Sequence, residues 1–283
     1  MKRIRLMTIA LLLAALMLGC FVLRADLVFD KVSNRLIKKS MADFSILEES
    51  EEYTVSLKSK KLAILKKTDE YAVAQGCCSD GEYIYGVIRK SDDSGAIIRK
   101  HKLSDGSYVA TSEELFLGHG NDLTYDSKND RIVCARGQSL GDVLIFIDPH
   151  TLTITGSVEL DTKAGAITYN EKTDCYAISR GGKTLDILNS DFEIIASYQR
   201  TDQTGYTAQG MGSDDHYLYF PMSFKDRKNI VVVYDWCGNY ITTVKSDVTR
   251  EAESMFWVNG KYYFAHNYYM EGMNIWEGTF TIE

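Results

Sequence analysis

The chain has 283 residues, 45% of them hydrophobic, which is enough apolar material to bury a sizeable core and argues against a disordered protein. Its formal net charge is −7, and three of its 32 basic residues lie within the first five positions. The remaining 29 basic and 39 acidic residues give an acidic body, which argues against a general nucleic-acid binder.

The first predicted element is an apolar segment, Leu6 to Leu23, preceded by three basic residues. Its 18 residues are just enough to cross a bilayer as a helix. Three interpretations stay open: an uncleaved signal anchor, a lipoprotein signal and a cleaved signal peptide. The lipoprotein interpretation rests on Met17-Leu18-Gly19-Cys20, which resembles a lipoprotein box ending in the lipidated cysteine. All three place the body outside the cytoplasm, and we expect it at the cell membrane.

The sequence predicts three parts along the chain. Residues 1–25 form the signal anchor or lipoprotein signal, residues 26–60 a charged stalk, and residues 61–283 a repeat domain. The stalk ends in an acidic run, which is typical of a solvated segment, and we assign it no chemistry.

The repeat domain is recognised by five anchor residues separated by 46, 44, 44 and 44 positions: Cys77, Leu123, Ile167, Met211 and Met255. The stretch Ala74-Gln75-Gly76-Cys77 recurs almost unchanged as Ala208-Gln209-Gly210-Met211. A period of 40 to 50 residues is typical of the blades of a β-propeller. The sequence therefore predicts an all-β, five-bladed β-propeller preceded by an N-terminal transmembrane or signal helix.

Each repeat contains four predicted strands, with the anchor on the innermost and a tyrosine-rich strand second. The fifth repeat ends near Glu283 without a fourth strand. The segment Leu62 to Lys67 lies before the first anchor and can supply it. We therefore expect the N-terminal strand to close the last blade.

The cysteines of the repeat domain form no Cys-x-x-Cys metal pair. Their spacing favours small buried hydrophobic residues. A vicinal redox disulfide between Cys77 and Cys78 is the alternative.

Polar residues near the starts of the inner strands are expected to converge at one mouth of the central channel: Gln75, His119, Asn121, Asp122, Gln209 and Glu253. The alternative is that they hold neighbouring blades together through backbone hydrogen bonds. Basic residues recur on the same face at the ends of the second strands, at Arg89, Arg136 and Arg180. Such a ring favours a carboxylate or phosphate ligand, although arginines at solvated strand ends are equally common. No cofactor is expected, except that Glu253, Asp122 and Asn121 carry oxygens suited to Ca²⁺.

In the regular spacing of its repeats from Gln75 onward, the chain resembles the extracytoplasmic propellers that include NHL-type and streptogramin-lyase-like proteins. A narrower similarity is to plant-type glutaminyl cyclases, which are five-bladed and carry a Phe-Thr-Gln-Gly stretch and a Leu-Tyr-Glu-Ser-Thr-Gly strand. This chain has Val73-Ala74-Gln75-Gly76 and Ile84-Tyr85-Gly86-Val87, so the glutamate of that family falls at Gly86.

The sequence thus predicts a membrane-anchored, extracytoplasmic propeller that acts as a ligand-binding or protein-interaction module. Its expected partners are the membrane, through the N-terminal segment, and a small anionic ligand or an envelope protein, with no nucleic acid. The alternative is a cyclase-like or lyase-like propeller enzyme at the channel mouth. In that case Glu253 or Asp122 acts as the base and His119 as the acid.

Overall fold

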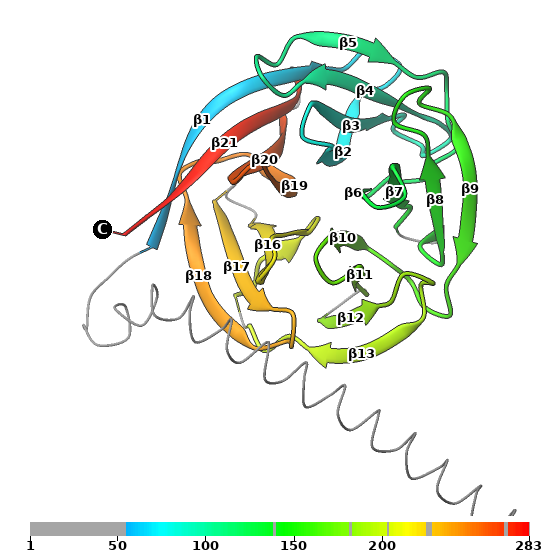
Figure 1. The fold of residues 1–283 in the computed structure, drawn as a ribbon. Helices are drawn as coiled ribbons and strands as arrows, with labels where there is room; N and C mark the ends of the chain where they lie inside the picture. The colour runs from blue at the N-terminus through cyan, green and yellow to red at the C-terminus, as the bar shows by residue number, and fades with distance from the viewer. Residues whose placement is uncertain are drawn as a thin grey trace, which may run out of the picture. The chain divides into compact units, whose positions relative to one another are not determined.

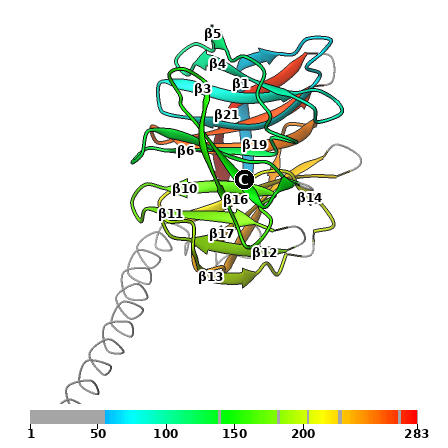
Figure 2. The ribbon, with the colours of Figure 1, turned by 90° about the vertical axis from the view of Figure 1, so that its right-hand side faces the viewer.

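The computed structural model describes residues 55–137, 140–180, 183–202, 204–224, 228–268 and 271–282. These residues form a ring of five antiparallel blades around a central axis, as Figure 1 shows face-on. Figure 2 shows the ring from its side, with β3 to β5 at the top and β11 to β13 at the bottom. The predicted all-β, five-bladed propeller is confirmed. The described ranges contain no helix of the length and hydropathy that a membrane crossing requires. The predicted N-terminal helix lies outside them.

The first three blades are separate four-stranded sheets in chain order. Blade 1 consists of β2 (Val73–Ser79), β3 (Tyr83–Arg89), β4 (Ala96–Lys102) and β5 (Tyr108–Thr111). Blade 2 consists of β6 (Asp122–Asp126), β7 (Arg131–Ala135), β8 (Val143–Ile147) and β9 (Ile154–Glu159). Blade 3 consists of β10 (Ala166–Asn170), β11 (Cys175–Ser179), β12 (Thr184–Leu188) and β13 (Ile194–Gln199).

The last two blades are joined through the N-terminal strand. Blade 4 consists of β14 (Thr207–Ala208), β15 (Gly212–Ser213), β16 (Tyr217–Ser223), β17 (Asn229–Asp235) and β18 (Tyr240–Ser246). Blade 5 consists of β19 (Glu251–Val258), β20 (Lys261–Tyr268), β21 (Gly272–Ile282) and β1 (Val55–Lys66). A parallel contact between β1 and β18 merges both blades into one sheet.

The N-terminal strand supplies the missing fourth strand of blade 5, as expected. It pairs antiparallel with β21 along almost its whole length, from Val55 opposite Ile282 to Lys66 opposite Gly272. In Figure 1 the blue β1 and the red β21 lie side by side. The strand begins at Val55, so residues 55–60 belong to the propeller rather than to the predicted stalk.

The core is divided among the wedges between neighbouring blades. In the described residues, five buried hydrophobic clusters each join one blade to the next. Alternation along an inner strand sends successive side chains into different wedges. Cys77 therefore packs between blades 1 and 5, whereas Cys78 packs between blades 1 and 2. Cys77, Cys78, Cys134 and Cys175 are free and buried, as expected of small hydrophobic residues, whereas Cys237 is partly exposed.

The second-strand tyrosines have a structural role at the loops joining the inner strand to the second strand. The hydroxyl of Tyr85 donates to Asp80 at 2.6 Å, and that of Tyr219 donates to Asp214 at 2.5 Å. Each aspartate also accepts backbone N–H groups of its own turn. The aspartate fixes the turn, and the tyrosine ring fills the wedge between blades. The same Asp–Tyr pair therefore does this in both blade 1 and blade 4.

The repeated Ala-Gln-Gly stretch marks a close approach between inner strands. A Cβ on Gly76 would lie 2.4 Å from the Cα atom of Asp122 in blade 2. A Cβ on Gly210 would lie 2.3 Å from the carbonyl oxygen of Glu253 in blade 5. Glycine is therefore required there by packing, because any side chain would collide with the backbone of the next blade.

Candidate functional site

One buried carboxyl group lies at the centre of the inner strands. The residues just before the five anchors are Gly76, Asp122, Ala166, Gly210 and Ser254. Four of them are small, and Asp122 is completely buried. Its Oδ2 accepts the backbone N–H of Ile167 at 3.1 Å and of Met211 at 2.9 Å, while Oδ1 accepts that of Leu123 at 3.1 Å. A single side chain thereby joins blades 2, 3 and 4.

Ser254 extends this link to the other two blades. Its Oγ lies 2.6 Å from Oδ1 of Asp122 and 3.1 Å from the carbonyl oxygen of Cys77. A hydroxyl has one proton and cannot donate to both acceptors. Burial raises the pKa of Asp122 to about 8, against the opposing effect of its hydrogen bonds. If Asp122 is protonated, it donates to the Ser254 hydroxyl, and that hydroxyl donates to the carbonyl oxygen of Cys77. Each of these three groups then has a hydrogen-bond partner.

Two of the three predicted amide residues, Asn121 and Gln209, also connect blades. The side-chain amide of Asn121 donates to the carbonyl oxygens of Gly165 and Gln209, the latter at 2.8 Å. Gln209 donates to Glu251 at 2.9 Å. Gln75 is buried and donates to the carbonyl oxygen of its neighbour Ala74 at 2.8 Å. These contacts agree with the alternative in which mouth residues hold the ring together.

The three candidate catalytic residues have different surroundings. His119 contacts Asp93, at 3.1 Å from Nδ1, and Arg89, at 3.4 Å from Nε2. Burial lowers the pKa of His119, and the hydrogen bond with Asp93 opposes this. Glu253 is buried at 3% exposure, and burial raises its pKa well above the usual value. The carboxylate beside His119 is thus Asp93, not Asp122 or Glu253.

The three predicted arginines have different surroundings. Arg89 lies 2.7 Å from Asp93, so its charge is balanced within blade 1. The guanidinium of Arg136 is buried and lies over the ring of Phe116, 4.8 Å from its centre. Arg180 holds Asp186, with Nη2 at 2.8 Å from Oδ1 and Nε at 2.6 Å from Oδ2. Of these three, only Arg180 lines a hollow described here.

That hollow, which we call the mouth hollow, lies between blades 3 and 4 and has a volume of about 610 Å³. Its predicted lining residues are Asn121, Arg180 and Gln209. The residues that the sequence analysis missed and that supply its charge and its aromatic wall are Lys183, Arg200, Asp202 and Tyr206. Ser179, Thr204 and Thr207 add hydroxyl groups.

The segment that follows blade 3 forms one wall of the mouth hollow and is held in place by Tyr234. The Tyr234 hydroxyl accepts the backbone N–H of Thr201 at 2.8 Å and of Asp202 at 2.9 Å, and donates to Asp202 Oδ1 at 2.8 Å. Arg200 lies 3.6 Å from Asp202 and over the ring of Phe220, 4.4 Å from its centre. Burial lowers the pKa of Arg200, while the charge of Asp202 opposes this. The wall is therefore fixed before any ligand arrives.

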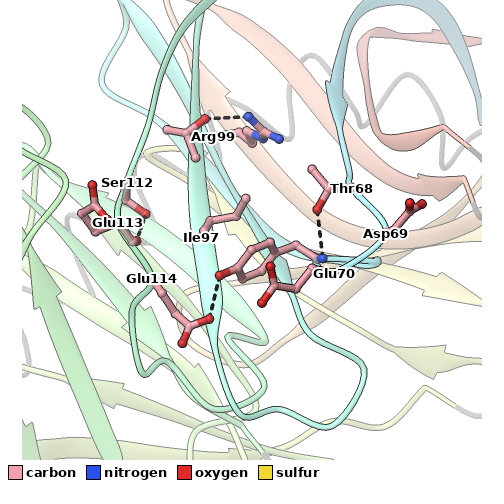
Figure 3. Close-up of a pocket in the computed structure, with 10 residues that line it drawn as sticks. Thr68, Asp69, Glu70, Ile97, Arg99, Ser112, Glu113 and Glu114 are labelled. Atoms are coloured by element: carbon pink, nitrogen blue, oxygen red, sulfur yellow. Dashed lines mark hydrogen bonds between the residues drawn. The ribbon is translucent and has the colours of Figure 1, made fainter.

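A second hollow, of about 630 Å³, lies on the outer side of blade 1 and is shown in Figure 3. Acidic residues dominate its lining: Asp69, Glu70, Glu113 and Glu114. Lys90 pairs with Glu70 at 2.9 Å and also with Glu114, which accepts the Tyr71 hydroxyl at 2.6 Å. This hollow is shallower, and Lys90 partly neutralises two of its carboxylates. The mouth hollow is therefore the better candidate.

No group of three or more metal-ligating side chains is found among residues 55–282 outside the gaps given above. Both oxygens of Asp122 accept backbone N–H groups, and the Asn121 amide nitrogen donates to carbonyl groups. The possible Ca²⁺ site stays a prediction.

The fold and the mouth hollow define the class of protein as a five-bladed β-propeller with a polar, partly basic depression at one end of its blades. No protein-family model matches the chain, and no curated protein matches it. Among solved structures it is similar to the tail fiber of Staphylococcus aureus phage P68, at 14% identity and a TM-score of 0.55. The similarity covers 78% of this chain and 52% of the tail fiber, so the chain spans about half the length of that protein.

Two further solved structures are less similar to this chain. Kuenenia stuttgartiensis hydrazine synthase is 12% identical with a TM-score of 0.43, covering 71% of this chain and 57% of that protein. The β-propeller domain of Myceliophteria thermophila Cps50 (Swd1) is 9% identical with a TM-score of 0.45, covering 78% of this chain and 100% of that domain. At these identities the comparisons concern the fold alone. The predicted relationship to NHL-type proteins or glutaminyl cyclases stays a prediction.

Proposed function

We propose that this protein is a membrane-anchored, extracytoplasmic binding module whose mouth hollow takes a small anionic ligand. The observation that carries the proposal is the mouth hollow itself, a prearranged depression with three cationic side chains: Arg180, Lys183 and Arg200. Its volume of about 610 Å³ falls within the range of small-molecule sites, roughly 300–1,000 Å³.

The balance of charges in the mouth hollow favours an anion. Arg180 is paired with the fully buried Asp186, and Arg200 with Asp202. Lys183 is exposed and has no ion pair within the part of the chain that the structure describes. One positive charge is therefore left over at the rim, where it attracts a ligand without a desolvation cost for a buried ion.

Binding is favoured over the enzyme alternative by two observations. His119 is hydrogen-bonded to Asp93, and the described lining of the mouth hollow includes none of His119, Asp122 and Glu253. At the position of the cyclase glutamate, a Cβ on Gly86 would lie 2.5 Å from Leu65 and 2.8 Å from Met273. A carboxylate side chain there would have to displace the ends of the Leu65 and Met273 side chains in the wedge between blades 1 and 5.

The test is isothermal titration calorimetry of the full-length protein in detergent against phosphate- and carboxylate-bearing fragments of the cell envelope. We expect at least one saturable ligand whose affinity falls about tenfold in Lys183→Ala, because a charge-assisted contact contributes roughly 1.5–3 kcal/mol. The matched control is Lys102→Ala, which removes an exposed lysine at the end of β4. If no fragment binds, or if both variants bind alike, the proposal fails and a protein partner becomes the better hypothesis.

A further inference from the structure

The mouth hollow combines charge with an aromatic wall. Tyr206 lines it and lies against Phe224, with the ring centres 5.1 Å apart and the planes inclined by 40°. The Phe224 side chain is 44% exposed, so it supports the tyrosine without being part of the core. A half-buried ring backed by a second ring gives a rigid apolar surface beside polar groups.

The rest of the lining is suited to a ligand with many hydroxyl groups. Three hydroxyl side chains, two amides and one carboxylate line the mouth hollow together with the tyrosine: Ser179, Thr204, Thr207, Asn121, Gln209 and Asp202. Hydroxyl and amide side chains both donate and accept hydrogen bonds, and a carboxylate accepts them. A sugar ring has the complementary surface, since its C–H face stacks on an aromatic ring while its hydroxyls point to the sides.

The charge of the ligand follows from the ion pairs. With Arg180 neutralised by Asp186 and Arg200 by Asp202, Lys183 carries the one uncompensated charge among the described lining residues. One charge is matched by one carboxylate, whereas a phosphate monoester carries between one and two at neutral pH and would exceed it. The volume of about 610 Å³ is also far larger than a free phosphate requires.

We infer that the mouth hollow binds a saccharide bearing a single carboxylate, with its ring against Tyr206 and its carboxylate at Lys183 and Arg180. This inference rests on the proposed function and specifies its ligand class. The five-bladed ring supplies a rigid frame, so binding needs no rearrangement of the strands.

The test measures binding of four probes to the full-length protein by calorimetry: glucuronic acid, glucose, glucose 6-phosphate and an aspartate-containing tripeptide. We expect glucuronic acid to bind at least tenfold more tightly than glucose. Tyr206→Ala should weaken both sugars about tenfold, and Tyr206→Phe should retain the parent affinity because it keeps the ring. Lys183→Ala should abolish the preference for glucuronic acid over glucose, whereas Lys102→Ala should leave it unchanged.

The outcomes separate the two proposals. Binding of the phosphate or the peptide with dependence on Lys183, but no binding of glucuronic acid, overturns the saccharide inference and leaves an anionic ligand. Sugar binding that neither Tyr206→Ala nor Lys183→Ala alters places the sugar elsewhere and also overturns the inference. No binding by any of the four probes or by the envelope fragments contradicts both proposals.

Discussion

Asp122 is the residue on which the centre of the ring depends most. Replacing it by alanine removes the acceptor of three buried backbone N–H groups and the hydrogen-bond partner of the Ser254 hydroxyl. Each buried donor without a partner costs about 1–3 kcal/mol, so we expect Asp122→Ala to lower the free energy of unfolding by about 4 kcal/mol or more. Ser254→Ala removes one hydrogen-bond partner of Asp122 and should lower the free energy of unfolding by about 1–2 kcal/mol. Urea denaturation measures both, and equal losses would contradict the central role of the carboxyl group.

Arg180 is expected to matter for stability as well as for binding. Its partner Asp186 is completely buried and also accepts the Ser197 hydroxyl at 2.5 Å. Arg180→Ala leaves a buried carboxylate without its cation, and we expect a loss of about 3 kcal/mol. The double variant Arg180→Ala/Asp186→Asn removes the unpaired charge and should recover part of this loss. If thermal denaturation shows no recovery, the ion pair is not the cause.

His266 gives the folded state a dependence on pH. It is buried at 1% exposure, and burial lowers its pKa to about 3 from 6.5. Between these values the unfolded chain binds a proton that the folded chain does not, so stability contributed by the neutral imidazole is present above pH 6.5 and falls as the pH drops. At pH 5 this loss is about 2 kcal/mol. In His266→Gln the difference in unfolding free energy between pH 7 and pH 5 should shrink by that amount, and an unchanged difference would count against the assignment.

At the scale of the element, β1 is the strand that closes the ring. It covers the edge of β21, and its side chains Ala63 and Leu65 enter the core between blades 1 and 5. Deleting residues 62–67 should therefore lower the melting temperature far more than deleting residues 26–49, because it opens the ring and exposes a strand edge. Differential scanning calorimetry compares the two truncations. Equal melting temperatures would refute closure by this strand.

At the scale of the whole molecule, the proposed membrane anchor predicts that the propeller lies on the extracytoplasmic side of the membrane. Cys237 is a described cysteine that is not buried, so it reports where the propeller lies. We expect a membrane-impermeant maleimide to label intact cells that carry the protein, and we expect Cys237→Ser to lose that label. Labelling only after the cells are lysed would place the propeller on the cytoplasmic side and contradict the proposal.

The sequence alone determined the number of blades, the anchors of the inner strands and the closing strand. Blade geometry is local: each repeat of about 44 residues carries its own strand and turn signals, so the five anchors and the missing fourth strand are visible without knowing the fold. The exception is the start of β1, which lies at Val55 because its pairing with β21 extends beyond the repeat.

Only the tertiary structure decided what the mouth residues do. Asp122 is one polar residue among several in the sequence, and its role follows from four other blades that bring N–H groups, a hydroxyl and small side chains to its carboxyl group. Likewise, Lys183 and Tyr206 belong to different blades or connections and share a hollow only because blades 3 and 4 are neighbours. Contacts between blades depend on how the ring closes, and the pattern within a single repeat carries no signal for them.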